Sequence, residues 1–191
     1  MGMGKTGKFF SFQNLGEDCK PDLVTVGKSI TGGVYPASFV LGDNDVMFLI
    51  GAYECASTFA AAPLGIAAAE AAIAVLDDED LVQRATSIGS RFEQEVKSWH
   101  HQHIQRVSAR GADMRIWIKE SDPPSRVSAR RICALCLHNK LLLYPRGPVM
   151  RMSAPLVITD AELDMALATI RHAMDRVTDY DRIPGEKWHR S

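Results

Sequence analysis

Residues 21–43 read Pro21-Asp-Leu-Val-Thr-Val-Gly-Lys28-Ser-Ile-Thr-Gly-Gly33-Val-Tyr-Pro-Ala-Ser-Phe-Val-Leu-Gly-Asp43. Two apolar runs, residues 23–26 and 35–41, flank a glycine-rich turn, and short runs of this kind predict strands. Because neither run alternates with polar residues, we expect both strands to be buried on both faces, as in an α/β sheet. The segment therefore predicts an α/β fold class for this part of the chain.

Lys28 directly follows the first of these strands and lies inside the turn. A lysine held at the end of a buried strand loses part of its hydration, which favours the neutral amine over the ammonium ion. A neutral amine can attack an aldehyde and form a Schiff base, and nearby glycines let the backbone approach a bulky planar group. The alternative is an exposed loop lysine in a turn that needs glycine for its geometry.

Composition limits the classes of protein that the chain can represent. It has 191 residues, 46% apolar and 24% charged, with a formal net charge of −1. This allows one or two domains with a substantial core and excludes general disorder. The near-neutral balance gives no electrostatic reason to expect nucleic acid or a membrane surface as a partner. Residues 55–69, the longest uncharged run, fall short of the roughly 20 apolar residues that span a bilayer.

The four cysteines are too few for a disulfide framework in a chain of this length. We therefore expect a reducing, cytoplasmic compartment, and a mitochondrial one stays open if N-terminal residues are missing.

Hydrophobic periodicity predicts the helices. The alanine-rich residues 63–76 favour one helix, and apolar residues spaced three or four apart from Leu81 to Trp99 predict a second with one apolar stripe. Residues 126–139 also have a helical pattern. Thr159-Asp-Ala-Glu162 is a capping box that opens a last helix.

Strands are expected at residues 114–119, which alternate with one wet face, and at 141–144 and 149–153 around the turn Pro145-Arg-Gly-Pro148. We therefore expect part of a large α/β domain over residues 1–76, followed by three further segments. These are a connecting helix over 77–104, a small α+β domain over 105–178 and a flexible tail over 179–191. The large domain has few strand candidates for a parallel sheet, which is built from βαβ crossovers.

The string from Pro21 to Asp43 resembles the cofactor-lysine region of class III pyridoxal-phosphate-dependent aminotransferases. Within that family it is most similar to the ornithine-type enzymes, through Gly32-Gly-Val-Tyr-Pro36 and Ser38-Phe-Val-Leu-Gly-Asp43, and the resemblance extends from residue 2 to about Val177. It implies a fold-type-I architecture comprising part of the large α/β domain and the small C-terminal domain. It also implies pyridoxal 5′-phosphate as the cofactor, held by Lys28, which then moves the proton in catalysis.

A second match is Ala56-Ser57-Thr58-Phe59, just before the alanine-rich helix. Hydroxyls and amides near a helix N-terminus suit a phosphate, although an ordinary helix cap is the simpler interpretation without the family. The resemblance implies that Ser57 and Thr58 bind the cofactor phosphate of the neighbouring subunit in a homodimer. The sequence departs from the family at Cys55, usually histidine, and at residues 60–62, where Ala-Ala-Ala replaces Gly-Gly-Asn.

The third match is Met150-Arg151-Met-Ser-Ala-Pro-Leu156. A guanidinium offers two parallel donors to a carboxylate, whereas an arginine on an edge strand is otherwise usually solvated or salt-bridged. The resemblance implies that Arg151 binds the α-carboxylate of amino-acid and 2-oxo-acid substrates.

The resemblance also implies parts that precede the first motif: an acidic residue for the pyridine nitrogen, an aromatic that stacks on the ring, and a phosphate loop. We expect these parts to be missing, which predicts a truncated aminotransferase of low turnover that moves the terminal amine of a diamino acid to 2-oxoglutarate. Two alternatives stay open. One is a non-catalytic remnant that acts as a dimerisation or regulatory partner, and the other is an aminotransferase for 4-aminobutyrate or acetylornithine.

Other chemically suggestive residues are expected to be structural. Cys133-x-x-Cys136 predicts core packing, and the histidines of residues 100–103 predict a solvated helix end, so we expect no metal site. Three arginines are expected on the wet face of a helix and not in a nucleic-acid patch. They are Arg126, Arg130 and Arg131.

Overall fold

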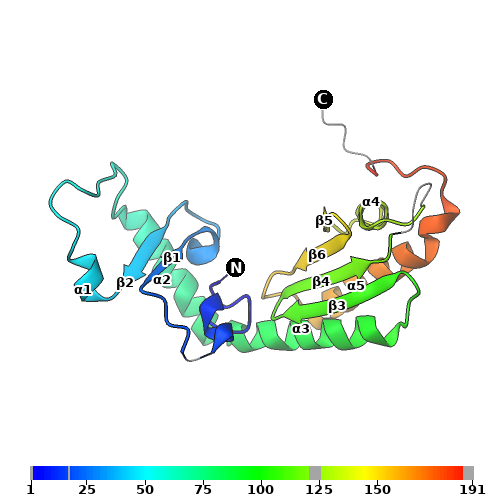
Figure 1. Cartoon of the computed structure of the whole chain (residues 1–191), viewed down its shortest axis with the longest axis horizontal. Coiled ribbons are helices and arrows are strands. Elements are labelled where there is room, and N and C mark those ends of the chain that lie inside the picture. The colour runs from blue at the N-terminus through cyan, green and yellow to red at the C-terminus, as the bar shows by residue number, and fades with distance from the viewer. Residues whose placement is uncertain (1, 17, 121–125, 187–191) are drawn as a thin grey trace. The chain divides into compact units, whose positions relative to one another are not determined.

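A computed structural model of the chain describes residues 2–16, 18–120 and 126–186. The chain divides into two compact units, Met1–Arg84 (unit 1) and Ala85–Ser191 (unit 2). Figure 1 shows the order of the helices and strands along the chain.

Unit 1 holds a two-stranded antiparallel sheet, β1 and β2, in which Leu23 pairs with Gly42 and Val26 pairs with Phe39. The elements of unit 1 in chain order are η1 (Ser11–Leu15), β1 (Leu23–Val26), η2 (Lys28–Thr31), β2 (Phe39–Gly42), α1 (Asn44–Met47) and α2 (Pro63–Asp78). Helix α3 (Leu81–Ser98) begins in unit 1 and continues into unit 2.

The sequence predicts both strands of unit 1, but the expectation that they are buried on both faces is wrong. No residue of β1 or β2 is fully buried, and three of the four residues of β2 are exposed. The strands pair antiparallel, and an antiparallel sheet commonly packs only one face on a core. Here Val26 and Phe39 are the strand residues that pack against that core.

The core of unit 1 is small. Its buried apolar side chains are Met3, Ile30 and Ala69, which come from the N-terminal segment, η2 and α2. Because η2 supplies Ile30 to this core, the turn that follows β1 is held in place by burial.

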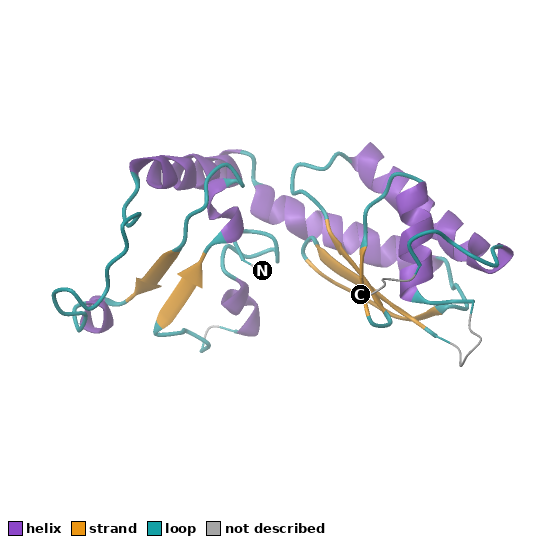
Figure 2. Ribbon diagram, turned by 90° about the horizontal axis from the view of Figure 1, so that it is seen from above, coloured by secondary structure: helices purple, strands orange, loops and turns teal. Residues whose placement is uncertain are grey.

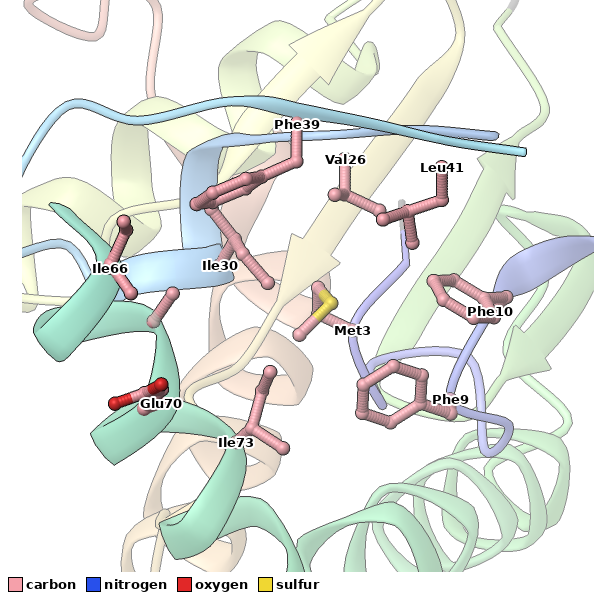
Figure 3. A pocket seen from close by; sticks show the side chains of 11 residues that line it. Met3, Phe9, Phe10, Val26, Ile30, Phe39, Leu41, Ile66, Glu70 and Ile73 are labelled. Atoms are coloured by element: carbon pink, nitrogen blue, oxygen red, sulfur yellow. The ribbon is translucent and has the colours of Figure 1, made fainter. Parts of the chain in front are cut away.

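An apolar groove of about 230 Å³ lies beside this core. Phe9 and Phe10 from the N-terminal segment, Leu41 from β2, and Ile66 and Ile73 from α2 line it, and Figure 3 shows their side chains around a common space. Unit 1 therefore presents contiguous apolar surface in addition to its buried core.

The predicted helices of residues 63–76 and 81–99 are confirmed as α2 and α3. Pro63 is the first residue of α2, a position where its missing N–H costs no hydrogen bond. Residues 77–104 do not form a single connecting helix, because Asp80 adopts a left-handed φ of 47° between α2 and α3. In α3, Ile88 and Phe92 are fully buried, as the predicted apolar stripe requires.

Unit 2 is a four-stranded antiparallel sheet of order β3-β4-β6-β5. Figure 2 shows the helices of this unit along one side of its strands. The elements are β3 (Ile104–Arg110), β4 (Asp113–Ile118), α4 (Ala129–His138), β5 (Tyr144–Arg146), β6 (Val149–Ser153), α5 (Asp160–Arg176) and η3 (Val177–Asp179).

Strand β3 is absent from the sequence-based prediction. It is an edge strand with no fully buried residue and a register irregularity between Ile104 and Arg106, so its apolar residues do not alternate regularly. The strand expected at residues 141–144 lies instead at Tyr144–Arg146 (β5), at the other edge of the sheet, so the expected turn at 145–148 is shorter than predicted.

Alternate residues of β4 form the centre of the unit 2 core. Met114 and Ile116 are fully buried and belong to one apolar cluster with residues of α3, α4, α5 and β6. The capping box is confirmed: the Glu162 backbone N–H donates to Thr159 Oγ1 at 3.2 Å, and the Thr159 N–H donates to Glu162 Oε2 at 2.9 Å. The hydrogen bond from this backbone N–H lowers the pKa of Glu162.

Arg131 does not lie on a wet helix face, so that part of the prediction is wrong. It is 9% exposed, its guanidinium pairs with Glu186, and its Nη2 donates to the carbonyl of Tyr180 at 2.6 Å. The segment after η3 also buries Ile183. The expected flexible tail therefore does not describe all of residues 180–186, because Ile183 and Glu186 pack against the rest of unit 2. Residues 187–191 lie outside the described part.

Within the described residues, none of the helices combines the length and apolar character that crossing a bilayer requires. The same part of the chain contains no group of three or more histidine, cysteine, aspartate or glutamate side chains arranged to hold a metal ion.

Gly89 packs α3 closely against the turn between β3 and β4. A Cβ at this position would overlap the carbonyl of Gly111, with the carbonyl carbon 2.9 Å away. We expect Gly89→Ala to lower the free energy of unfolding by about 2 kcal/mol, because the backbone of that turn must shift. Denaturant unfolding followed by circular dichroism measures the loss. Ser90→Ala, at the exposed neighbouring position of α3, should stay within about 0.5 kcal/mol of the parent, and an equal effect of both variants contradicts the packing argument.

Cys133 and Cys136 are buried in the core, as predicted, whereas Cys19 and Cys55 are exposed. Burial raises the pKa of both buried thiols to about 12. At about pH 8 they are therefore protonated and unreactive in the folded protein. We expect a thiol-specific reagent to label Cys19 and Cys55 rapidly. A variant with Cys19→Ser and Cys55→Ser should react only after denaturant is added, and rapid labelling of this variant would contradict the burial of the pair.

Candidate functional site

Lys28 is the first residue of η2, directly after β1 and Gly27. Its backbone has a φ of 55°, in the left-handed region that non-glycine residues seldom adopt. Such a conformation costs of order 1–3 kcal/mol and persists only where neighbouring structure enforces it. The position of Lys28 is therefore imposed by the surrounding turn and not by its own preference.

The turn is fixed by the residues that follow Lys28. Ile30 and Thr31 are buried, and the Thr31 hydroxyl donates to the carbonyl of Tyr35. Gly32 ends η2 with a φ of 62°, and its N–H donates to the carbonyl of Ser29 at 3.0 Å. A left-handed residue is needed here, which is the conformation that glycine adopts without a steric penalty.

A groove of about 1130 Å³ lies next to this turn within unit 1. Lys28 and Ser57 both line it, as do Tyr35, Cys55 and Phe59. The structure therefore brings together two of the residues predicted for cofactor binding. Thr58 follows Ser57 in the same exposed loop but is not one of the lining residues, so its predicted role has no counterpart within this groove.

Two premises of the sequence interpretation need correction. Lys28 is exposed, so the loss of hydration expected at the end of a buried strand does not occur in this structure. Ser57 and Thr58 do not cap α2, because the N-cap residue is Ala62 and no side chain caps the helix. The Ser57 hydroxyl instead accepts a long hydrogen bond, 3.4 Å, from the Phe59 N–H.

Arg151 lies on β6 in unit 2, where the sequence predicts a carboxylate-binding arginine. Its Nε donates to Asp113 Oδ1 at 3.0 Å, and its side chain is 31% exposed. The contact with Asp113 uses the Nε edge of the guanidinium, so the N–H groups of Nη1 and Nη2, for which the described residues provide no hydrogen-bond partner, are left for a ligand.

Asp113 and Arg115 were not identified from the sequence. Asp113 is 4% exposed, and its second carboxylate oxygen accepts from Arg115 Nη2. The sequence does contain one signal for these residues: residues 113, 115 and 117 alternate with the buried apolar residues of β4 and therefore lie on the opposite face of the strand. Nothing in the local sequence indicates, however, that this face meets Arg151, which lies 38 residues away in the chain.

The family model for aminotransferase class III matches residues 1–174. The chain belongs to this family. The match covers both Lys28 and Arg151, so the two site segments recognised by resemblance lie within the aligned region.

Curated relatives include ornithine aminotransferases of staphylococci. The chain is 36% identical over 171 residues to ornithine aminotransferase 2 of Staphylococcus aureus strain Mu50, covering 90% of this chain and 41% of the relative. It is 38% identical over 170 residues to the ornithine aminotransferase of Staphylococcus epidermidis, covering 89% and 41%. The chain therefore spans about two-fifths of the length of these relatives.

Solved structures give the same result for the fold. The acetylornithine aminotransferase of Elizabethkingia anophelis matches with a TM-score of 0.81 and 33% identity, covering 92% of this chain and 43% of that one. The ornithine aminotransferase of Toxoplasma gondii matches with a TM-score of 0.83 and 31% identity, covering 94% and 42%, and its active site holds pyridoxal phosphate at partial occupancy. These matches confirm the expected α/β fold class of fold-type-I pyridoxal-phosphate enzymes and the resemblance stated from the motifs.

Proposed function

We propose that this chain carries the cofactor-lysine and substrate-carboxylate segments of a pyridoxal-phosphate-dependent aminotransferase of the ornithine type. Its reaction moves the terminal amine of a diamino acid to a 2-oxo acid such as 2-oxoglutarate. The observation that carries the proposal is that Lys28 and Ser57, on separate segments matched by the family, line one groove. Under this proposal residues 1–76 belong to the large cofactor-binding domain, 77–104 connect the domains, 105–178 form the small domain and 179–191 are its tail.

The groove fits two ends of pyridoxal phosphate. Lys28 supplies an amine for the aldehyde, and the Ser57 hydroxyl is a donor that suits a phosphate, which in the proposed homodimer belongs to the cofactor of the neighbouring subunit. The remaining lining is largely apolar or aromatic, including Tyr35, Phe39 and Ile66, which suits a planar ring. Among the described lining residues there is no carboxylate to pair with the ring nitrogen, so the fit covers the aldehyde and phosphate ends only.

When bound, the cofactor supplies a reactive aldehyde and an electron sink. Lys28 Nζ holds the aldehyde end and, as a free amine, accepts and returns the proton that moves during transamination. The fixed turn at Ile30 and Thr31 keeps that nitrogen at the groove. Ser57 Oγ and Thr58 Oγ1 donate to the phosphate of the neighbouring subunit's cofactor, across the subunit contact.

Arg151 orients the substrate. Its Nη1 and Nη2 donate to the α-carboxylate of the amino acid or 2-oxo acid, while Asp113 keeps the opposite edge of the guanidinium in place. A bound carboxylate is thereby held in one plane, which lowers the entropy cost of orienting the substrate.

Association into a homodimer is part of this proposal. Unit 1 exposes large apolar side chains that a monomer would leave in water: Val34, Phe48, Tyr53, Phe59 and Leu64 are each at least 70% exposed. Exposed apolar patches of this kind mark interaction surfaces. The unpaired state of all four cysteines supports a cytoplasmic location.

The exposed apolar surface and the exposure of Lys28 also favour a second candidate function. A non-catalytic chain that associates with a complete aminotransferase would use the exposed apolar surface as its interface. It would not need a lysine amine shielded from water, so an exposed Lys28 is compatible with it. Transaminase activity of the purified chain alone, with ornithine and 2-oxoglutarate, contradicts this candidate. Activity with 4-aminobutyrate or acetylornithine, and not with ornithine, identifies the chain as an aminotransferase for another ω-amine substrate.

We expect pyridoxal phosphate followed by borohydride to label the chain at Lys28, because its amine is the one that lines the groove. Peptide mass spectrometry locates the added group, and Lys28→Ala should lose at least about nine-tenths of the specific label. Lys20→Ala is the matched control, since Lys20 is exposed and pairs with Asp43 outside the groove. Equal labelling of Lys20 and Lys28 would contradict the cofactor role.

We expect Arg151→Met to raise the dissociation constant of glutarate, a dicarboxylate probe, by about tenfold or more, because two charge-assisted donors are lost. Isothermal titration calorimetry on the full chain measures this binding without requiring turnover. Arg106→Met is the control, because Arg106 is an exposed arginine of β3 that stacks on Trp117 and does not contact Asp113. The carboxylate role of Arg151 is wrong if its substitution leaves glutarate binding unchanged.

A further inference from the structure

Asp113 holds two arginines at once. Its Oδ1 accepts from Arg151 Nε at 3.0 Å and its Oδ2 accepts from Arg115 Nη2, so each carboxylate oxygen carries one guanidinium. We call these three residues the arginine–aspartate cluster. All three lie in unit 2, on the two central strands of its sheet.

The strand register explains why the aspartate is shared. Arg115 on β4 is the direct cross-strand partner of Arg151 on β6, and like charges in this position repel. Asp113 lies two residues before Arg115 and therefore on the same face of β4. Its side chain is 5% exposed, and its carboxylate lies against both guanidinium groups. The Arg115 and Arg151 side chains are 38% and 31% exposed.

The charge balance of the cluster favours an anion. Two guanidinium ions and one carboxylate leave one positive charge without a partner inside the cluster. If Arg115 were absent, Asp113 would neutralise Arg151 alone, and the pair would have no net charge with which to attract a substrate carboxylate. Arg115 thus affects Arg151 through the aspartate that they share.

We propose that Arg115 is a specificity-determining residue for carboxylate substrates: by sharing Asp113 with Arg151, it keeps one positive charge of the cluster available to the substrate. The proposal rests on the proposed role of Arg151 and deepens it. It predicts that the net charge of the cluster, more than any contact of Arg115 with the ligand, sets the affinity for a carboxylate.

The test measures glutarate binding to the full chain by isothermal titration calorimetry. We expect Arg115→Met to raise the dissociation constant about fivefold or more, because the cluster becomes neutral. The double variant Arg115→Met/Asp113→Asn restores one net positive charge and keeps a side-chain oxygen that can accept from Arg151 Nε, so its dissociation constant should fall clearly below that of Arg115→Met, back toward the parent. Arg115→Lys keeps the charge and should stay within about threefold. Arg106→Met controls for the loss of a positive charge elsewhere on the sheet.

The outcomes separate this inference from the function on which it rests. If Arg151→Met abolishes binding and Arg115→Met leaves it unchanged, the inference is overturned and the carboxylate role of Arg151 stands. If Arg115→Met weakens binding and the double variant does not recover, charge sharing is overturned in favour of a structural effect. If the parent does not bind glutarate, or Arg151→Met binds it equally well, both the charge-sharing inference and the carboxylate role of Arg151 are overturned.

Discussion

The two-residue period of β4 is the constraint on which unit 2 depends. Met114 and Ile116 are buried against the helices, so the residues between them must emerge on the other face of the sheet. A shift of one residue would bury charged side chains and expose the core, which fixes the register strongly. The same alternation that builds the core therefore places Arg115 opposite Arg151 and Asp113 on the same face of β4.

Unit 1 fixes the position of Lys28 by a different means. Lys28 is held by the geometry of the turn, through the burial of Ile30 and the hydrogen bond from Thr31 to Tyr35. Its side chain is exposed while its backbone is constrained. In the proposed enzyme, the desolvation that favours a neutral amine must therefore come from whatever fills and covers the groove, and not from the strand that precedes the lysine.

The parts of the fold that sequence could predict are those with a regular local pattern. Helices α2, α3 and α5 follow from periodicity and capping, and β4 follows from strict alternation. Edge strand β3 lacks such a pattern, and the apolar runs of β1 and β2 could not show whether one or both faces are covered.

For the candidate site, too, the sequence predicts features that depend on neighbouring residues and misses those that depend on residues far apart in the chain. Lys28, Ser57 and Arg151 were identified through family motifs, which are local in sequence. Ion pairs such as Arg151 with Asp113 and Arg131 with Glu186 join residues 38 and 55 positions apart, and no local pattern specifies such pairs. Burial of Arg131 was missed for this reason.

The packing of the C-terminal segment against Arg131 has a practical consequence for dissecting the molecule. Ile183 fills the unit 2 core, and Glu186 supplies the countercharge of a guanidinium that is 9% exposed. A fragment that stopped at Asp179 would leave that cation buried without its carboxylate and would open a void in the unit 2 core. An autonomous version of unit 2 should therefore run to at least Glu186, and fusion tags belong beyond that residue.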